Sequence, residues 1–134
     1  MGSKVLHIGE VGKGSAFKML VNLLLAQSMV AFSETVLLGE KMGLSRDFLL
    51  DQLPGLPVTA PFIKAKAEMI RNKEFDVQFP LELMYKDLHL ASVTAYENKQ
   101  ALFQGNIAKE LFGLASQKGY ERKDFSAIYE FLAG

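Results

Sequence analysis

Apolar residues dominate the stretch from Ser15 to Met42, where they fall on nearly every side of a 3.6-residue helical repeat. This pattern predicts one long helix over residues 15–42, most of it buried. Gly43 follows directly and suits the left-handed position just beyond a helix end. The helix carries more apolar residues than one buried stripe requires, so we expect either an exposed interaction face or a bundle that covers the whole surface.

Residues that begin or end helices divide the rest of the chain into shorter segments. Serine, threonine, asparagine and aspartate suit helix caps, proline suits the first turn, and glycine suits a break. The predicted helices are Ser45–Leu53, Thr59–Asn72, Phe79–Asn98, Asn106–Lys118 and Asp124–Leu132, with breaks at residues 54–57, Gly105 and Gly119. The predicted fold is all-α: a helical bundle domain with one long N-terminal helix.

A short strand is predicted before the long helix. Residues 4–8, KVLHI, alternate enough for a strand, but no second segment of comparable strength follows for pairing. We therefore divide the chain into residues 1–11, a residual strand and linker, and residues 12–134, a helical domain. The strand is expected to be frayed or to pair through its open edge with another copy.

Composition and charge exclude several classes of function. The 134 residues are 49% apolar, enough for one core, and 15 basic residues balance 15 acidic ones. Without a basic block, neither nucleic acid nor a membrane surface is an expected partner. The chain has no cysteine, and His7 and His89 are too isolated to suggest a metal site.

The most apolar run, residues 19–32, is predicted to be core rather than a membrane span. It contains Asn22, Gln27 and Ser28 and is flanked by charged residues, so it falls short of the roughly 20 apolar residues that a span needs. No charged segment followed by an apolar one opens the chain, and a cytoplasmic location is expected.

A polar patch interrupts the start of the long helix. Lys18 and Asn22 are one turn apart, roughly 40° from eclipsing, so both side chains point toward the same place. Gly12 and Gly14 precede them and suit a tight turn where a ligand could approach the free amide groups of the helix, so this place should favour anions. The alternative is that Lys18 extends to solvent and Asn22 satisfies a neighbouring group.

Three motifs in order give the chain a family resemblance. They are G-x-G-x-x-x-K-x-x-x-N over residues 12–22, KDLHLA over residues 86–91 and GYERKDFSAI over residues 119–128. Together they resemble the β-hydroxyacid dehydrogenase family, which includes 3-hydroxyisobutyrate dehydrogenases. The stretches FSETVLLGEKMGL and DVQFPLELMYKDL look most like the glyoxylate and succinic semialdehyde reductases.

The resemblance covers only the second, C-terminal half of such an enzyme. The family's first half is a Rossmann domain opened by G-x-G-x-x-G, but here Gly14 is followed three residues later by Phe17. By the resemblance, residues 4–8 would be the last strand of that missing domain. The expected partners are that Rossmann domain, which binds NADP or NAD, and a small hydroxy acid or aldehyde.

The resemblance also implies roles for individual residues. Lys18 would exchange the proton of the substrate hydroxyl, and burial among apolar neighbours would help it to give and take that proton. Asn22, Gly12 and Gly14 would bind substrate. Lys86 would contact the nicotinamide cofactor; its alternative is a solvated lysine paired with Glu82 or Asp87. Phe79 would be a core residue or a wall of the same cleft.

Two functions remain open. The first is the substrate-binding and dimerisation half of an NAD(P)-dependent oxidoreductase that interconverts a small 3- or 2-hydroxy acid and its semialdehyde or keto acid. The 134-residue fragment alone would then be inactive and hold no cofactor. The second is a non-enzymatic helical oligomerisation module of the same fold. A homo-oligomer is expected in either case.

Overall fold

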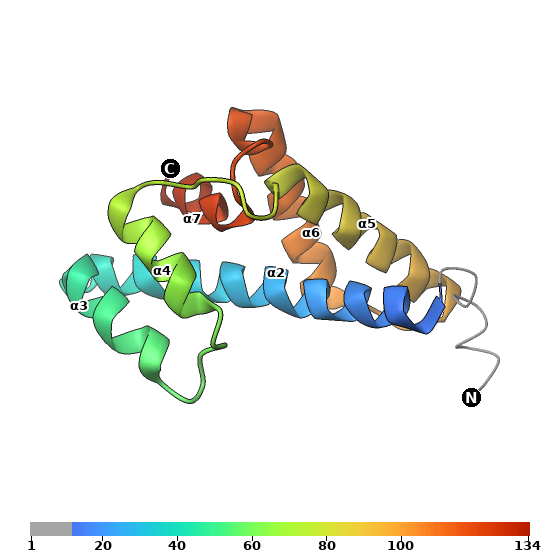
Figure 1. The fold of residues 1–134 in the computed structure, drawn as a ribbon, viewed down its shortest axis with the longest axis horizontal. Coiled ribbons are helices and arrows are strands. Elements are labelled where there is room, and N and C mark those ends of the chain that lie inside the picture. The colour runs from blue at the N-terminus through green and yellow to red at the C-terminus, as the bar shows by residue number, and fades with distance from the viewer. Residues whose placement is uncertain (1–11) are drawn as a thin grey trace.

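The computed structural model describes residues 12–134, with side chains from Gly14 onward, and this part of the chain is all-α without a strand, as predicted (Figure 1). Residues 1–11, which include the predicted strand and His7, lie outside the described residues. The helices are α2 (Gly12–Lys41), α3 (Arg46–Gln52), α4 (Ile63–Asn72), α5 (Leu81–Glu97), α6 (Phe103–Ala115) and α7 (Ile128–Ala133). Shorter turns are η2 (Leu53–Gly55), η3 (Ser116–Tyr120) and η4 (Phe125–Ala127).

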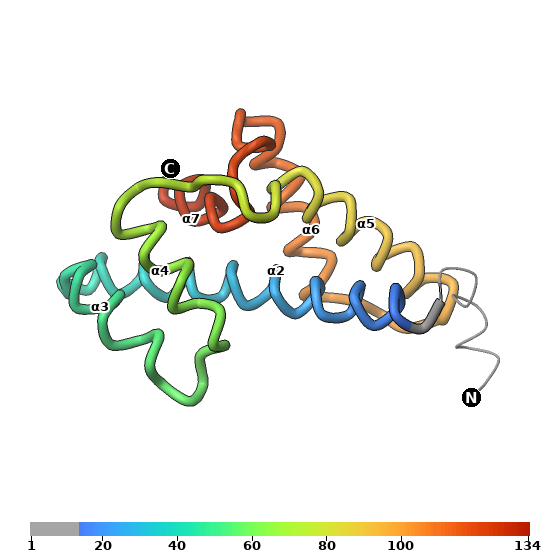
Figure 2. Tube along the Cα trace, in the orientation of Figure 1, coloured from blue at the N-terminus to red at the C-terminus, as the bar shows by residue number. Residues whose placement is uncertain are grey.

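Helix α2 runs along the length of the molecule, and the other helices pack against it (Figure 1). Helices α5 and α6 contact each other and lie along the N-terminal half of α2, whereas α3 and α4 lie at its C-terminal end. Figure 2 traces the segment that runs from the end of α4 across the top of the view to the start of α5. This topology places the C-terminal end of α5 near the start of α2.

One face of α2 forms the centre of the core. Ala26, Met29 and Val36 are fully buried, and the hydroxyl of Ser33 donates to the carbonyl of Met29 at 2.8 Å. Residues from the other helices complete this core, among them Met84, Leu88, Phe112 and Ile128. The core explains why an apolar helix of this length folds in water: burying its large side chains stabilises the domain by about 1.5–3 kcal/mol each.

The composition of α2 does not by itself exclude a membrane span, contrary to the reasoning from the sequence. By length and composition alone, residues Gly14–Lys41 could cross a membrane, because Asn22, Gln27 and Ser28 do not lower the mean hydropathy enough to exclude it. Packing distinguishes a core helix from a membrane-spanning one here, since the face that carries Met29 and Val36 is covered by other helices. Helix α2 is therefore a core helix in this structure.

The predicted end of the long helix is confirmed. Gly43 has φ +100°, the N–H of Leu44 donates to the carbonyl of Gly39 at 3.0 Å, and the N–H of Gly43 donates to that of Glu40 at 3.0 Å. This pair of hydrogen bonds is the Schellman motif, which requires the left-handed residue that glycine supplies. Ser45 then caps α3, with its hydroxyl accepting from the N–H of Phe48 at 3.1 Å.

The prediction that Gly105 and Asn106 separate two helices is wrong. Helix α6 begins at Phe103 and continues through both residues. A Cβ on Gly105 would lie 2.8 Å from Cγ of Leu102 and 3.0 Å from Cδ1 of Leu23. Gly105 therefore allows α6 to approach α2 closely rather than ending a helix. The break at Gly119 is confirmed, since it has φ +98° within the π-helical turn η3.

Candidate active site

A hydrogen bond joins two of the three sequence motifs. The side chain of Asn22 on α2 is buried, and its Nδ2 donates to Oδ2 of Asp87 on α5 at 2.8 Å. A carboxylate only accepts hydrogen bonds, so the amide group of Asn22 must face Asp87 and its Oδ1 must face elsewhere. Asp87 thereby fixes which way Asn22 presents its acceptor.

Lys18 lies one turn before Asn22 on the same side of α2, as predicted. The described residues, however, leave Lys18 exposed rather than buried. The side chains of Lys18, Phe17 and Leu20 are all exposed, and among residues 14–134 Lys18 has no hydrogen bond or ion pair. The first turns of α2 project past the core formed by the described residues, so those residues do not supply the expected apolar surroundings of Lys18.

The two glycines do not form the expected turn. Helix α2 begins at Gly12, three residues earlier than predicted, because glycine also adopts helical dihedral angles. A Cβ on Gly14 would meet no atom within 4 Å, so nothing in the described chain requires glycine there. Gly14 leaves the surface of the first turn of α2 bare, one turn before Lys18.

Lys86 lies on the exposed side of α5. The predicted buried positions Leu81, Met84, Leu88 and Ala91 are confirmed, and they place Lys86 outside the core. In the described chain Lys86 pairs with neither Glu82 nor Asp87, although the sequence left that alternative open. Its ammonium group is exposed to a ligand or a second domain, and Lys86 is the residue before Asp87, whose carboxylate holds Asn22.

Phe79 has a structural role in this chain. Its ring meets that of Phe125 edge to face, with the centroids 6.1 Å apart, at the border of the core. It is half-buried, so one side of the ring remains accessible. Phe79 is therefore a core residue that could also contribute a wall at the start of α5.

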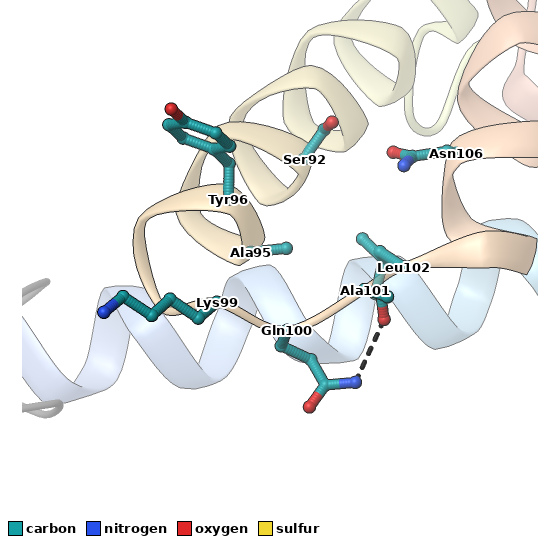
Figure 3. A pocket seen from close by; sticks show the side chains of 8 residues that line it. All are labelled: Ser92, Ala95, Tyr96, Lys99, Gln100, Ala101, Leu102 and Asn106. Carbon is teal, nitrogen blue, oxygen red and sulfur yellow. Dashed lines mark hydrogen bonds between the residues drawn. The ribbon is translucent and has the colours of Figure 1, made fainter.

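Two surface pockets lie near the start of α2. One, of about 500 Å³, is formed where α5 ends and α6 begins; Ser92 and Asn106 point toward the space between these helices (Figure 3). The second, of about 410 Å³, shares residues with it and reaches Met19, Leu20 and Leu23 of α2. Neither of these two pockets is lined by Lys18, Asn22 or Lys86, so they are separate from the predicted site residues.

No metal centre is present in the part of the chain that the structure describes. His89 is exposed, and no group of three or more histidine, aspartate or glutamate side chains is close enough to hold a metal ion.

Two functional relationships were missed from the sequence. Asp87 was interpreted only as part of a motif and as a possible partner of Lys86, not as the partner of Asn22. The buried ion pair between Lys66 and Asp124, with Nζ and Oδ2 2.8 Å apart, was not predicted. A signal for it existed, because Lys66 lies at helical spacing between the apolar residues Ile63 and Ile70.

A long helix packed against shorter helices, with a lysine and a buried asparagine one turn apart, agrees with the family resemblance of the sequence. The family model described as "NAD-binding of NADP-dependent 3-hydroxyisobutyrate dehydrogenase" matches residues 12–132. The chain belongs to this 3-hydroxyisobutyrate dehydrogenase family.

Relatives with curated names agree with this placement. The chain is 35% identical over 130 residues to glyoxylate/succinic semialdehyde reductase 1 of Arabidopsis thaliana, which covers 97% of this chain and 45% of the relative. It is 31% identical over 148 residues to the mitochondrial 3-hydroxyisobutyrate dehydrogenase of Homo sapiens, covering 98% of this chain and 41% of the relative. The chain thus spans less than half the length of either relative.

Solved structures show the same fold. The 3-hydroxyisobutyrate dehydrogenase of Salmonella typhimurium superposes with a TM-score of 0.83 at 23% identity, over 90% of this chain and 42% of that one. The enzyme of Mycobacterium tuberculosis, solved with L-serine, gives 0.80 at 26% identity, over 90% of this chain and 44% of that one.

Proposed function

We propose that this chain is the helical, substrate-side domain of an NAD(P)-dependent hydroxyacid dehydrogenase or reductase. The observation that carries the proposal is the hydrogen bond between Asn22 and Asp87. It links the lysine- and asparagine-bearing turn of α2 to the turn of α5 that carries Lys86. This part-buried hydrogen bond gives the amide of Asn22 one orientation, one helical turn after Lys18.

Lys18 is the proposed proton carrier. In the reductive direction its ammonium group gives a proton to the substrate oxygen and becomes a neutral amine; in the oxidative direction the amine takes that proton back. Asn22 gives its Nδ2 to Asp87, so its Oδ1 can accept a hydrogen bond from the substrate hydroxyl. Gly12 and Gly14 place no side chain at two positions of the first turn of α2, where substrate would approach.

Lys86 is the proposed contact to the cofactor. It is exposed and pairs with no acidic residue in the described chain, which fits a cation that meets an anionic or electron-rich group of a dinucleotide held by another domain. When bound, the nicotinamide supplies or accepts the hydride. That second domain would also exclude water from Lys18, which this chain leaves exposed.

The proposed substrate is a small 2- or 3-hydroxy acid, or the corresponding semialdehyde or keto acid. The relative with 35% identity is named a glyoxylate and succinic semialdehyde reductase, which favours reduction of an aldehyde. The Mycobacterium tuberculosis relative was solved with L-serine, a small 3-hydroxy acid. A cytoplasmic location remains part of the proposal.

A homo-oligomer is proposed from the outer face of α2. Phe17, Leu24, Ala31 and Leu38 recur every seven residues on the side opposite the buried Met29, and three of them are large and exposed by 68, 67 and 63%. A seven-residue apolar repeat is the spacing by which one helix packs along another. We call these four residues the α2 stripe.

The alternative function, a non-enzymatic oligomerisation module, would use the same stripe. Lys18, Asn22 and Lys86 distinguish the two, because an oligomerisation module needs none of them. The direct experiment is to assay the longer protein that contains this chain for NADPH and NADH oxidation with glyoxylate and succinic semialdehyde. Turnover supports the enzyme; inactivity across small aldehydes and keto acids would favour the module. For this chain alone we expect no turnover and no measurable NADPH affinity.

A further inference from the structure

The side chain of Asp124 connects its own turn with two other segments of the chain, α4 and residues 78–79. It is fully buried, and its Oδ2 accepts hydrogen bonds from Nζ of Lys66 at 2.8 Å and from the hydroxyl of Ser126 at 2.6 Å. Its Oδ1 accepts from the backbone N–H groups of Gln78 and Phe79, each at 3.0 Å. Because Oδ2 accepts from α4 and Oδ1 accepts from the segment before α5, the carboxylate holds these two parts in one fixed arrangement.

The backbone next to Asp124 also holds the first turn of α5. Pro80, the N-cap residue, supplies no side-chain hydrogen bond. Instead the N–H of Leu81 donates to the carbonyl of Lys123 at 2.8 Å, and that of Glu82 donates to the carbonyl of Glu121 at 3.0 Å. These are two of the N–H groups that every helix leaves free at its start. Residues 121–124 therefore determine where α5 begins.

The start of α5 and the Asp87 side of the candidate site lie on the same helix. Asp87 lies six residues after Leu81, which is roughly 9 Å along a rigid helix. A shift or rotation at the first turn is therefore carried to the carboxylate that holds Asn22. We propose that Asp124 is a positioning residue for the candidate active site: it sets the register at which Asp87 meets Asn22. The consequence for turnover rests on the proposed function, whereas the structural coupling does not.

A purely structural role makes a different prediction. If Leu81, Met84 and Leu88, all nearly fully buried, fix α5 by themselves, losing the carboxylate would lower global stability without changing the bond between Asn22 and Asp87. If Asp124 sets the register, losing the carboxylate also changes the structure locally, at α5 and at the Asn22 hydrogen bond. It should loosen the first turn of α5 and weaken the Asn22 hydrogen bond while the opposite end of the bundle is unaffected.

The test is nuclear magnetic resonance of this chain carrying Asp124→Asn, which keeps the shape of the side chain but removes its charge. We expect the Asn22 side-chain amide resonances to move toward those of an exposed asparagine. The amides of Leu81 and Glu82 should exchange at least about tenfold faster relative to those of α2.

The matched control is Tyr129→Phe, which removes the 2.8 Å hydrogen bond from Tyr129 to Glu40 at the far end of α2. It should lower stability without moving the Asn22 resonances. Unchanged Asn22 resonances in the Asp124 variant, or equal shifts in both variants, would overturn the proposal.

A milder variant keeps the test decisive if Asp124→Asn does not fold. Ser126→Ala removes one hydrogen bond to Oδ2 and leaves the ion pair with Lys66. A smaller shift of the same Asn22 resonances is expected, and no shift would overturn the proposal. An inactive longer protein in which these resonances still shift would contradict the proposed function but not the positioning role.

Discussion

Asn22 and Asp87, 65 residues apart in sequence, form a hydrogen bond of 2.8 Å between the first half of α2 and the middle of α5. Lys18 and Lys86 flank this bond in sequence, one turn before Asn22 and one residue before Asp87. Both lysines are exposed, and neither has an acidic partner in the described chain. This hydrogen bond joins α2 to α5 at the candidate site and orients the side chain of Asn22.

Replacing Asn22 by aspartate should destabilise the chain by about 1–3 kcal/mol at neutral pH, because two carboxylates would then face each other where a hydrogen bond was. The repulsion raises the pKa of this new carboxyl pair in the folded state. The loss should therefore be small near pH 4 and grow as the pH rises toward 7. Urea unfolding at several pH values measures it. Asn106→Asp, at an exposed position on α6, is the control; an equal, pH-independent loss in both would contradict the assignment.

The ion pair between Lys66 and Asp124 should matter less in acid. Burial raises the pKa of Asp124, but hydrogen bonds from Lys66, Ser126 and backbone amides outweigh it and hold the pKa below the ordinary 3.8. The stability that this carboxylate contributes is therefore complete above that value and is lost as the pH falls through the lower folded pKa.

Lys66→Met should accordingly lower stability by about 3–5 kcal/mol at pH 7, because it leaves a buried carboxylate without its cation. The loss should be smaller at pH 3, where Asp124 can take up a proton. Unfolding by urea at both pH values measures the difference. Lys64→Met, an exposed position on the same helix, should change little at either pH, and equal losses for Lys66→Met at pH 7 and pH 3 would argue against the pair.

Tyr129 should lose its hydroxyl proton at a higher pH than an ordinary tyrosine. Burial, and then the hydrogen bond that it donates to Glu40, raise its pKa from 10.0 to about 12. The stability from this group is complete below pH 10 and is lost as the pH rises toward 12. Tyrosinate absorbance of the wild type minus that of Tyr129→Phe should isolate this late titration. A difference titration that is complete near the ordinary tyrosine value of 10.0 would refute the account of this contact.

The α2 stripe should control assembly. Leu24→Glu places a charge in the middle of the stripe and should convert an oligomer of this chain into monomer, since burying an unpaired carboxylate at a helix interface is costly. Val77→Glu is the control, because Val77 is apolar and 50% exposed and lies in the segment between α4 and α5. Sedimentation velocity compares the three proteins. A wild type that stays monomeric at high concentration would show that the stripe is not an interface.

The sequence predicted helix ends correctly where the residue at the end has a single structural role. Gly43 and Ser45 mark real helix ends because their roles depend only on neighbouring backbone groups. Gly105 misled the prediction because glycine serves close helix packing as well as helix ends, and only the position of Leu23 distinguishes the two.

The site was predictable in parts. The spacing of Lys18 and Asn22 placed them on one side of a helix, but the pairing of Asn22 with Asp87 depends on how α2 and α5 cross. Burial of Lys18 was expected from its apolar neighbours in sequence. Those neighbours turn outward because the core lies on the other side of α2, and helical periodicity alone does not reveal which side is covered.

The central claim is that Lys18 carries the proton in a nicotinamide-dependent reaction. The most direct measurement is steady-state NADPH and NADH oxidation by the longer protein with glyoxylate and succinic semialdehyde, comparing wild type, Lys18→Ala and the exposed-lysine control Lys64→Ala. The account predicts that Lys18→Ala loses on the order of 10² or more in kcat with little change in KM, while the control keeps wild-type rates. An active wild type whose kcat is unchanged by Lys18→Ala would contradict it.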